Sequence, residues 1–351
     1  MIGAGQMGRN PFTDSPKNLK GRTMDAAALE ALIKESEAPK GPETGWEMKL
    51  TTLARGEAKL GEALKRYTSI QIGGPADALV FPENIEDLSN ILSFAKANRV
   101  PWMVLGNGSN ALVRDGGIRG IVLRLNKALH QLKLIDETEH YVLVEAEAGV
   151  PLPKLVEQGR QQGWEGVASL YGIPATVGGA LWMNAGTRKG EIKDVVQSVR
   201  VMLSDGSVEE YPAGKLKFEY RHLKLPAKGL ILSGQFRFQK GDKLAIQKTI
   251  EEYQTKRRET QPLESASLGS VFKNPEKGFA AQMIEELGLK GVRVGGARIS
   301  EKHANFIINE RDATAKDVLA LVGLVRDKVR DELEIRLELE AKVLGDDDES
   351  L

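Results

Sequence analysis

The spacing of apolar residues changes several times between residue 66 and residue 345. Positions 85, 88, 91, 92 and 95 are apolar and recur at the three- and four-residue intervals of an amphipathic helix, which we place over residues 85–97. Short apolar runs at 78–81 and 102–105 lie on either side and are predicted to be strands. The chain therefore alternates strands and helices in this region.

The alternation continues toward the C-terminus. The last hundred residues contain a predicted strand at 306–308 and a long helix from Ala315, whose apolar residues fall on one face. Strict alternation over 335–343 predicts a final strand with Glu338 and Glu340 on its polar side. Further strands are expected at 120–125, 141–144, 195–203, 207–211 and 230–238, and further helices at 152–162, 180–186, 243–258 and 278–287. This pattern predicts an α+β fold.

Residues 1–46 do not share the pattern. They carry glycine, proline, serine and lysine without a period, apart from a short helical patch at 25–33, and we expect a poorly ordered extension. Residues 3–8 match the dinucleotide fingerprint GxGxxG, which requires a strand before it and a helix after it. Only two residues precede Gly3, and Asn10-Pro11 follows at once, so we reject this match.

Composition narrows the classes of function. The 49 basic residues equal the 49 acidic ones and aromatic residues make up 5%, which argues against nucleic acid as a partner. The absence of cysteine excludes disulfides and thiolate sites, and the four scattered histidines argue against a metal site. No run approaches the length of a membrane span. We therefore expect a soluble cytoplasmic protein without a membrane partner.

Three glycine-rich stretches are candidate ligand sites. The first, residues 106–110 (Gly-Asn-Gly-Ser-Asn), could gather backbone N–H groups around a phosphate, but taken alone its Asn-Gly pair favours a tight turn. In the second, residues 172–179, Gly178 and Gly179 precede a predicted helix and should offer free N–H groups. The third spans residues 71–75. Together they suit a ligand with a long phosphate backbone, although packing explains each one separately.

Polar residues at three places are candidates for chemistry. Residues 267–275 (Ser-Leu-Gly-Ser-Val-Phe-Lys-Asn-Pro) place Ser270, Lys273 and Asn274 around two apolar side chains, either as a strand end or as an aimed chemical group. Arg221 is either a surface charge or a clamp for a carboxylate. Glu338 and Glu340 are by default solvated. The residues alone do not choose between these interpretations.

Six segments, in this order, resemble the UDP-N-acetylenolpyruvoylglucosamine reductase (MurB) family. The segments are residues 67–74 (YTSIQIGG), 105–110 (LGNGSN), 172–186 (GIPATVGGA with MNAG), 218–221 (FEYR), 269–275 (GSVFKNP) and 337–340 (LELE). One such segment is weak support, whereas six in the family's order are specific. The interval from Arg221 to Gly269 is short, so the chain resembles the subtype that lacks an extra tyrosine-bearing loop.

The resemblance implies a two-subdomain FAD-binding fold of the PCMH or vanillyl-alcohol-oxidase type, with a C-terminal α+β substrate-binding domain. We place the FAD-binding subdomains at 47–125 and 126–242 and the substrate domain at 243–351. The implied activity is NADPH-dependent reduction of UDP-N-acetylglucosamine-enolpyruvate to UDP-N-acetylmuramate in peptidoglycan precursor synthesis. FAD would be non-covalent, because there is no cysteine and neither loop contains histidine. We expect a monomer.

The resemblance also implies residue roles. Ser270 is the proton donor, and Arg221 and Glu340 polarise the substrate; only the family pattern selects Glu340 over Glu338. Expected substrate contacts are Tyr220, Lys273, Asn274 and Arg258. Expected FAD contacts are Gly106, Asn107, Gly108, Ser109, Asn110, Gly172, Ile173, Pro174, Thr176, Gly178, Gly179, Asn184 and Gly186. Two rivals are a different flavin oxidoreductase on the same scaffold and a catalytically silent UDP-sugar-binding protein.

Overall fold

The computed structural model describes residues 45–187 and 189–347. The fingerprint match at 3–8 and nearly all of the predicted extension lie outside these ranges. Trp46, the last residue of that extension, opens helix α2 (Trp46–Leu53), and its side chain is buried with Leu50 in the main core. The folded region thus includes Trp46.

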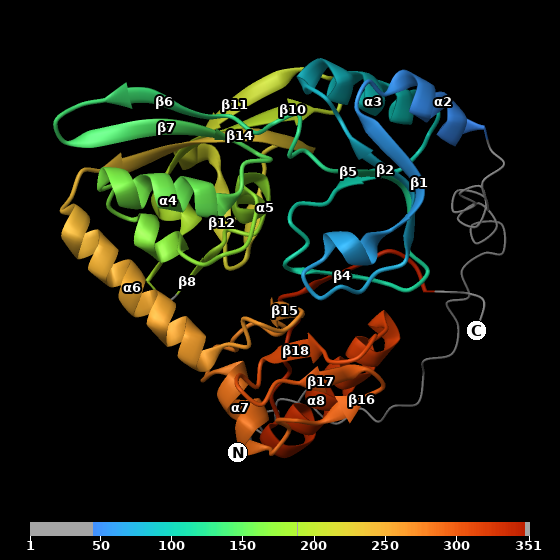
Figure 1. The fold of residues 1–351 in the computed structure, drawn as a ribbon, viewed down its shortest axis with the longest axis vertical. Coiled ribbons are helices and arrows are strands. Elements are labelled where there is room, and N and C mark those ends of the chain that lie inside the picture. The colour runs from blue at the N-terminus through green and yellow to red at the C-terminus, as the bar shows by residue number, and fades with distance from the viewer. Residues whose placement is uncertain (1–44, 188, 348–351) are drawn as a thin grey trace, which may run out of the picture. The chain divides into compact units, whose positions relative to one another are not determined.

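The first sheet has the strand order β1-β2-β5-β3 and carries helix α3 (Figure 1). Helix α3 (Ile85–Ala97) has the predicted bounds, because Asn84 caps it by accepting a hydrogen bond from the Asp87 N–H at 2.9 Å. The strands are β1 (Glu57–Ala63), β2 (Pro75–Phe81), β3 (Trp102–Val104) and β5 (Ile118–Leu123). Strands β2, β5 and β3 run parallel, whereas β1 is antiparallel to β2.

The second sheet is antiparallel with the order β11-β10-β14-β7-β6. Its strands are β6 (Leu132–Glu137), β7 (Tyr141–Glu147), β10 (Val196–Leu203), β11 (Val208–Pro212) and β14 (Gly229–Gln239). Helix α4 (Leu152–Gln162) spans its predicted range. Helix α5 (Val177–Trp182) corrects the prediction of 180–186: Thr176 caps it earlier, and the left-handed Asn184 (φ 40°) lies beyond its end.

The third sheet, of order β15-β18-β17-β16, belongs to the C-terminal region. Helix α6 (Lys243–Thr260) connects it to the second sheet, as Figure 1 shows. Its strands are β15 (Ser267–Ser270), β16 (Arg293–Val294), β17 (Ala297–Ile299) and β18 (Phe306–Asn309), and its helices are α7 (Ala280–Glu286) and α8 (Ala315–Leu333). The predicted apolar face of α8 is confirmed, since Val318, Leu321, Val322, Val325 and Val329 are all buried.

The predicted strand over 335–343 is wrong for most of its length. Only β19 (Lys342–Leu344) is a strand, and it pairs in parallel with β4 (Ala111–Val113). Upstream, the alternation of buried and exposed side chains persists, but backbone pairing is limited to an isolated bridge between Leu339 and Phe272. Burial alternates because the segment lies extended between two parts of the protein.

The remaining strands form two short pairs, β8 (Gly186–Thr187) with β9 (Gly190–Glu191), and β12 (Lys217–Glu219) with β13 (His222–Lys224).

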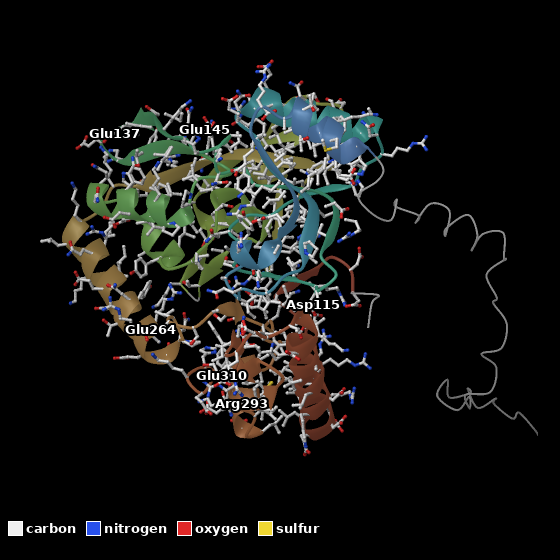
Figure 2. The ribbon with its side chains drawn as sticks, turned by 45° about the vertical axis from the view of Figure 1, so that its right-hand side comes forward. Asp115, Glu137, Glu145, Glu264, Arg293 and Glu310 are labelled. Carbon is white, nitrogen blue, oxygen red and sulfur yellow. The ribbon has the colours of Figure 1, made fainter. Side chains whose placement is uncertain are left out.

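Side chains also tie the C-terminal region to the first sheet. The Asp115 carboxylate, labelled in Figure 2, accepts hydrogen bonds from the N–H groups of Ala315 and Lys316 at 2.8 and 3.0 Å. A carboxylate at a helix N-terminus satisfies free N–H groups and the helix dipole together. Asp115 thus anchors α8. Elsewhere in the same figure Arg293 of β16 and Glu310, which follows β18, form an ion pair at 2.8 Å.

Asn305 holds the stretch that follows Ser270. Its buried amide accepts from the Phe272 N–H at 2.9 Å and donates to the Phe272 carbonyl at 2.8 Å. We expect Asn305→Ala to lower the free energy of unfolding by about 2–4 kcal/mol, because two buried backbone groups lose their partner. Urea unfolding measures the change, with the exposed Asn90→Ala as control. Equal stability of the two variants would contradict this role.

Candidate active site

A cavity of about 1540 Å³ lies between the three sheet regions. Its wall includes Leu105–Ala111 from the first, Tyr171–Thr176 from the second and Leu268–Ser270 from the third. This volume exceeds the ~300–1,000 Å³ typical of a pocket for one drug-sized ligand. The cavity therefore has room for two ligands in contact.

The loop at residues 106–110 has the geometry of an anion site. In the described part of the chain, none of its five backbone N–H groups donates a hydrogen bond to protein. Gly108 adopts φ 65° and lies against the Tyr67 carbonyl, where a Cβ would approach to 2.1 Å. Consecutive unpaired N–H groups on a cavity wall bind phosphate oxygens. This supports the phosphate interpretation of the loop over the plain turn.

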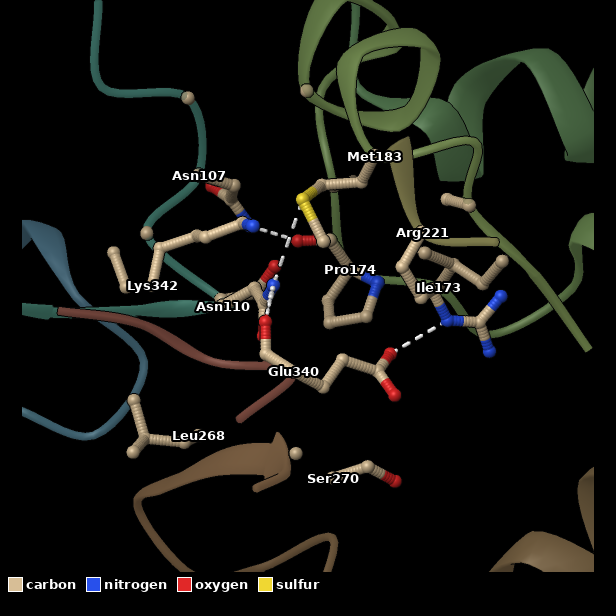
Figure 3. A pocket seen from close by; sticks show the side chains of 18 of the residues that line it. Asn107, Asn110, Ile173, Pro174, Met183, Arg221, Leu268, Ser270, Glu340 and Lys342 are labelled. Carbon is tan, nitrogen blue, oxygen red and sulfur yellow. Dashed lines mark hydrogen bonds and ion pairs between the residues drawn. The ribbon is translucent and has the colours of Figure 1, made fainter. Parts of the chain in front are cut away.

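The loop at residues 172–179 differs from its prediction. The N–H groups of Gly178 and Gly179, expected to be free, donate to the Ala148 carbonyl at 2.9 Å and to the Thr176 hydroxyl at 3.2 Å. These glycines therefore serve close packing: a Cβ at Gly178 would lie 2.8 Å from that of Ala148. The loop still lines the cavity, and Asn107 joins the two loops by donating to the Pro174 carbonyl at 2.7 Å (Figure 3).

Arg221 occupies the turn between β12 and β13. Its backbone is left-handed (φ 58°), a conformation that costs a non-glycine residue energy and that concentrates at functional sites. Its Nε donates to Glu340 Oε1 at 2.7 Å, and its Nη1 lies 3.6 Å from Glu191 Oε1. Its side chain is 17% exposed and lines the cavity. The surface-charge interpretation is therefore wrong.

Glu340 and Glu338, which periodicity could not separate, lie in different environments. The Glu340 side chain is 16% exposed and faces the cavity, whereas Glu338 is 75% exposed and pairs with Lys273 at 3.1 Å. The Glu340 backbone is fixed on two sides, because its N–H donates to the Val271 carbonyl at 2.9 Å and its carbonyl accepts from Asn110 Nδ2 at 3.1 Å. Its carboxylate is thus held beside Arg221.

Ser270 reaches the cavity through a β-bulge. Two residues of β15, Leu268 and Gly269, lie opposite one residue of β18, and Gly269 takes φ 73°. Such bulges redirect the next side chain. The Ser270 hydroxyl has no hydrogen-bond partner among the described residues, and in Figure 3 it lies on the side of the cavity that Glu340 and Arg221 face. The stretch around Ser270 is therefore both a strand end and a means of presenting a hydroxyl.

The structure brings most of the predicted residues together. Residues 106–110, 172–174, Thr176, Gly178, Gly179 and Gly186 line the cavity with the three candidate catalytic residues. Asn184 does not; it is fully buried, and its Nδ2 donates to Glu191 and to the Glu219 carbonyl.

The four predicted substrate contacts lie outside the cavity wall. Tyr220 stacks on Arg221 with the guanidinium carbon 4.8 Å from its ring centre, and Lys273 pairs with Glu338. Asn274 accepts from the Ala280 N–H at 3.1 Å and so holds the start of α7. The Arg258 carbonyl accepts from Lys302. In the structure these residues support neighbouring groups.

Sequence reasoning missed Arg124 on the cavity wall, and it also missed Arg257, next to Arg258. The Arg257 Nε donates to Gln261 at 3.0 Å and its Nη1 to the Gly172 carbonyl. Burial lowers the pKa of Arg257, and no carboxylate pairs with it among the described residues. Arg257 and Arg258 are adjacent in sequence, so the helical period of α6 shows which one faces the cavity only once the buried face of that helix is known. Trp182, Met183 and Lys342 also line the cavity and had no separate sequence signal.

Burial raises the pKa of the Glu340 carboxyl, and Arg221 opposes this rise without cancelling it. A raised pKa in the folded state means that stability is lost as the pH rises through that pKa. We expect Glu340→Gln to gain melting temperature relative to the parent protein as the pH rises above about 4.5, the ordinary pKa of a glutamate. Calorimetry without substrate checks this; a constant or shrinking difference would contradict it.

No group of three or more histidine or acidic residues in the described ranges is arranged to hold a metal ion. None of the helices in those ranges is long and apolar enough to cross a membrane.

Comparison with known proteins agrees with this geometry. An FAD-binding-domain model matches residues 76–211, and a model of the C-terminal domain of UDP-N-acetylenolpyruvoylglucosamine reductase matches residues 261–344. The reductase of Clostridium tetani is 38% identical over 299 residues, 85% of this chain and 95% of that protein. The one from Syntrophus aciditrophicus is 41% identical over 298 residues, with the same coverage. A crystal structure of the reductase from Thermus caldophilus has 39% identity and a TM-score of 0.68, covering 83% of this chain and 99% of that one.

The fold and the site define an FAD-dependent oxidoreductase. Both the expected fold class and FAD as cofactor are confirmed. The chain belongs to the UDP-N-acetylenolpyruvoylglucosamine reductase family. The domain limits at residues 125 and 242 and the roles of individual site residues stay predictions.

Proposed function

We propose that the protein reduces UDP-N-acetylglucosamine-enolpyruvate to UDP-N-acetylmuramate, a peptidoglycan precursor, with NADPH as the hydride donor. The observation that carries this proposal is the meeting of Ser270, Arg221 and Glu340 in one cavity with the unpaired N–H groups of residues 106–110. A clamp for a carboxylate, a proton donor and a phosphate site are what this substrate and cofactor require.

The residues fit FAD as a bound group. Residues 106–110 would hold its pyrophosphate, and the wall at 172–179 would contact its ring system. Bound FAD supplies hydride transfer between the two substrates.

Side chains would perform the remaining chemistry. When the enolpyruvyl methylene carbon accepts hydride, negative charge develops on the adjacent carbon and on the carboxylate. Arg221, oriented by Glu340, would stabilise that charge as it forms. The Ser270 hydroxyl would then protonate the carbon, because a carbanion-like centre is basic enough to accept a proton from a well-placed alcohol.

Binding of the UDP-sugar extends the proposal to the residues around the cavity. Arg257 offers an unpaired charge on the wall for the diphosphate. Tyr220, Lys273, Asn274 and Arg258 stay as proposed contacts; none of them lines the cavity in this structure, so each would move its side chain to reach the ligand. We further place the reaction in the cytoplasm, where NADPH is supplied. A monomer would suffice, since one chain contributes every proposed group.

Purified protein is expected to be yellow and to release all its FAD into the supernatant on acid precipitation, since the chain has no cysteine. Turnover of NADPH with the enolpyruvyl substrate should then yield UDP-N-acetylmuramate, identified by mass spectrometry. Flavin retained in the pellet would contradict non-covalent binding. A protein that binds the UDP-sugar without oxidising NADPH would be a silent binder, and one that reduces a different substrate would be another flavin oxidoreductase.

A further inference from the structure

The guanidinium of Arg221 is shared between two carboxylates. Its Nε bonds Glu340 at 2.7 Å, while its Nη1 faces Glu191 at 3.6 Å. The third nitrogen, Nη2, bonds to none of the described residues. A free arginine beside one carboxylate prefers a two-pronged pairing that engages two of its nitrogens. In this structure Glu340 engages only Nε, and a donor is left over for a ligand.

Glu191 is itself firmly placed. Its side chain is 17% exposed, and its Oε2 accepts from Asn184 Nδ2 at 2.9 Å and pairs with Lys193 at 2.6 Å. Its backbone N–H donates to Asp194 at 2.8 Å. Two groups therefore hold the carboxylate that faces Nη1, and Asp194 holds the backbone of the same residue.

Asn184 connects this carboxylate to the arginine hairpin. The same Nδ2 that holds Glu191 donates to the Glu219 carbonyl at 3.0 Å, two residues before Arg221. Asn184 is completely buried, and its backbone is left-handed, a conformation that asparagine adopts more readily than most non-glycine residues. A buried amide that bonds both Glu191 and the arginine hairpin is placed to support a functional group.

We propose that Glu191, held by Asn184, is a positioning residue that keeps Arg221 from pairing with Glu340 through two nitrogens and so reserves Nη2 for the substrate carboxylate. Glu191 does not line the cavity, so it acts through Arg221 and not on the substrate. The inference rests on the proposed reduction.

The test compares Glu191→Gln with the parent in both half-reactions. Stopped-flow absorbance should show flavin reduction by NADPH unchanged, because that step does not use Arg221. Reoxidation by the enolpyruvyl substrate should slow by about 10- to 100-fold, the usual cost of a misplaced catalytic group. Glu219→Gln is the matched control: its carboxylate lies in the same hairpin but pairs with the exposed Lys217 at 2.8 Å. It should behave as the parent.

A double-mutant cycle separates positioning from a general structural role. If Glu191 acts through Arg221, adding Glu191→Gln to Arg221→Met should cost no further rate. Additive losses, or reoxidation as fast as in the parent, would overturn the inference.

Flavin content and melting temperature are measured for each variant. If Glu191→Gln does not fold, Glu191→Asp, which keeps the charge, takes its place in the cycle. Failure of both to retain flavin, while Glu219→Gln retains it, would assign Glu191 to folding and overturn the inference. A parent protein that never reoxidises with this substrate would refute the proposed function instead.

Discussion

Ser270→Ala is expected to slow flavin reoxidation by UDP-N-acetylglucosamine-enolpyruvate by about 10²- to 10⁴-fold, the usual worth of a positioned proton donor. Flavin reduction by NADPH should keep its parental rate, because no proton from Ser270 enters that step. Stopped-flow absorbance of the flavin band, with each substrate added separately, resolves the two rates.

Ser267→Ala is the matched control, since Ser267 lies in the same short strand but outside the cavity wall. A small, equal change in both half-reactions for Ser270→Ala would show that the hydroxyl belongs only to the strand end. Unimpaired reoxidation would require another proton donor.

Arg221→Met should reduce the rate of reoxidation by about 10²- to 10³-fold, the cost of removing one donor aimed at developing negative charge. The loss should exceed that of Arg221→Lys, because lysine keeps the charge but not the planar fork that bonds Glu340 through one nitrogen and a ligand through another. Pre-steady-state reoxidation over a range of substrate concentrations separates a weaker affinity from a slower chemical step.

Arg200→Met provides the control for losing an arginine elsewhere, because Arg200 pairs with Glu145 in the second sheet, outside the cavity. Equal effects of Arg221→Met on both half-reactions would indicate that Arg221 stabilises the flavin site as a whole and does not act on the substrate.

The local sequence pattern was enough to predict elements that are stabilised by residues adjacent in sequence. Helices α3 and α4 appear where periodicity placed them, because their caps and apolar faces lie in adjacent sequence. The predictions were wrong where contacts with residues distant in sequence determine the structure. The segment 335–343 alternates like a strand, yet before Lys342 it pairs with no strand and makes only an isolated bridge to the stretch at Phe272. The N–H groups of Gly178 and Gly179 are used because Ala148 and Thr176 come close to them.

In the candidate site, too, some residues could be predicted from the sequence and others depend on distant contacts. Residue types at Ser270, Arg221 and Glu340 allowed two interpretations each, and the family resemblance selected among them. Glu191 and Asn305 gave no signal, since their importance depends on hydrogen bonds to Asn184 and Phe272 and on the distant Arg221. Arg257 could not be told from Arg258 before the packing of α6 was known.

The pairing of β19 with β4 has a consequence for the order in which the active site folds during synthesis. Asn110, in the loop at residues 106–110, and Glu340 are 230 residues apart, yet they share a hydrogen bond. Contacts of such long sequence separation form late, because the entropy of closing the intervening loop must be overcome first. On the ribosome, the first sheet can emerge and pair long before residues 340–344 are synthesised. Catalytic competence should therefore appear in one late step, and nascent chains that stop short of Lys342 should be folded in part but inactive.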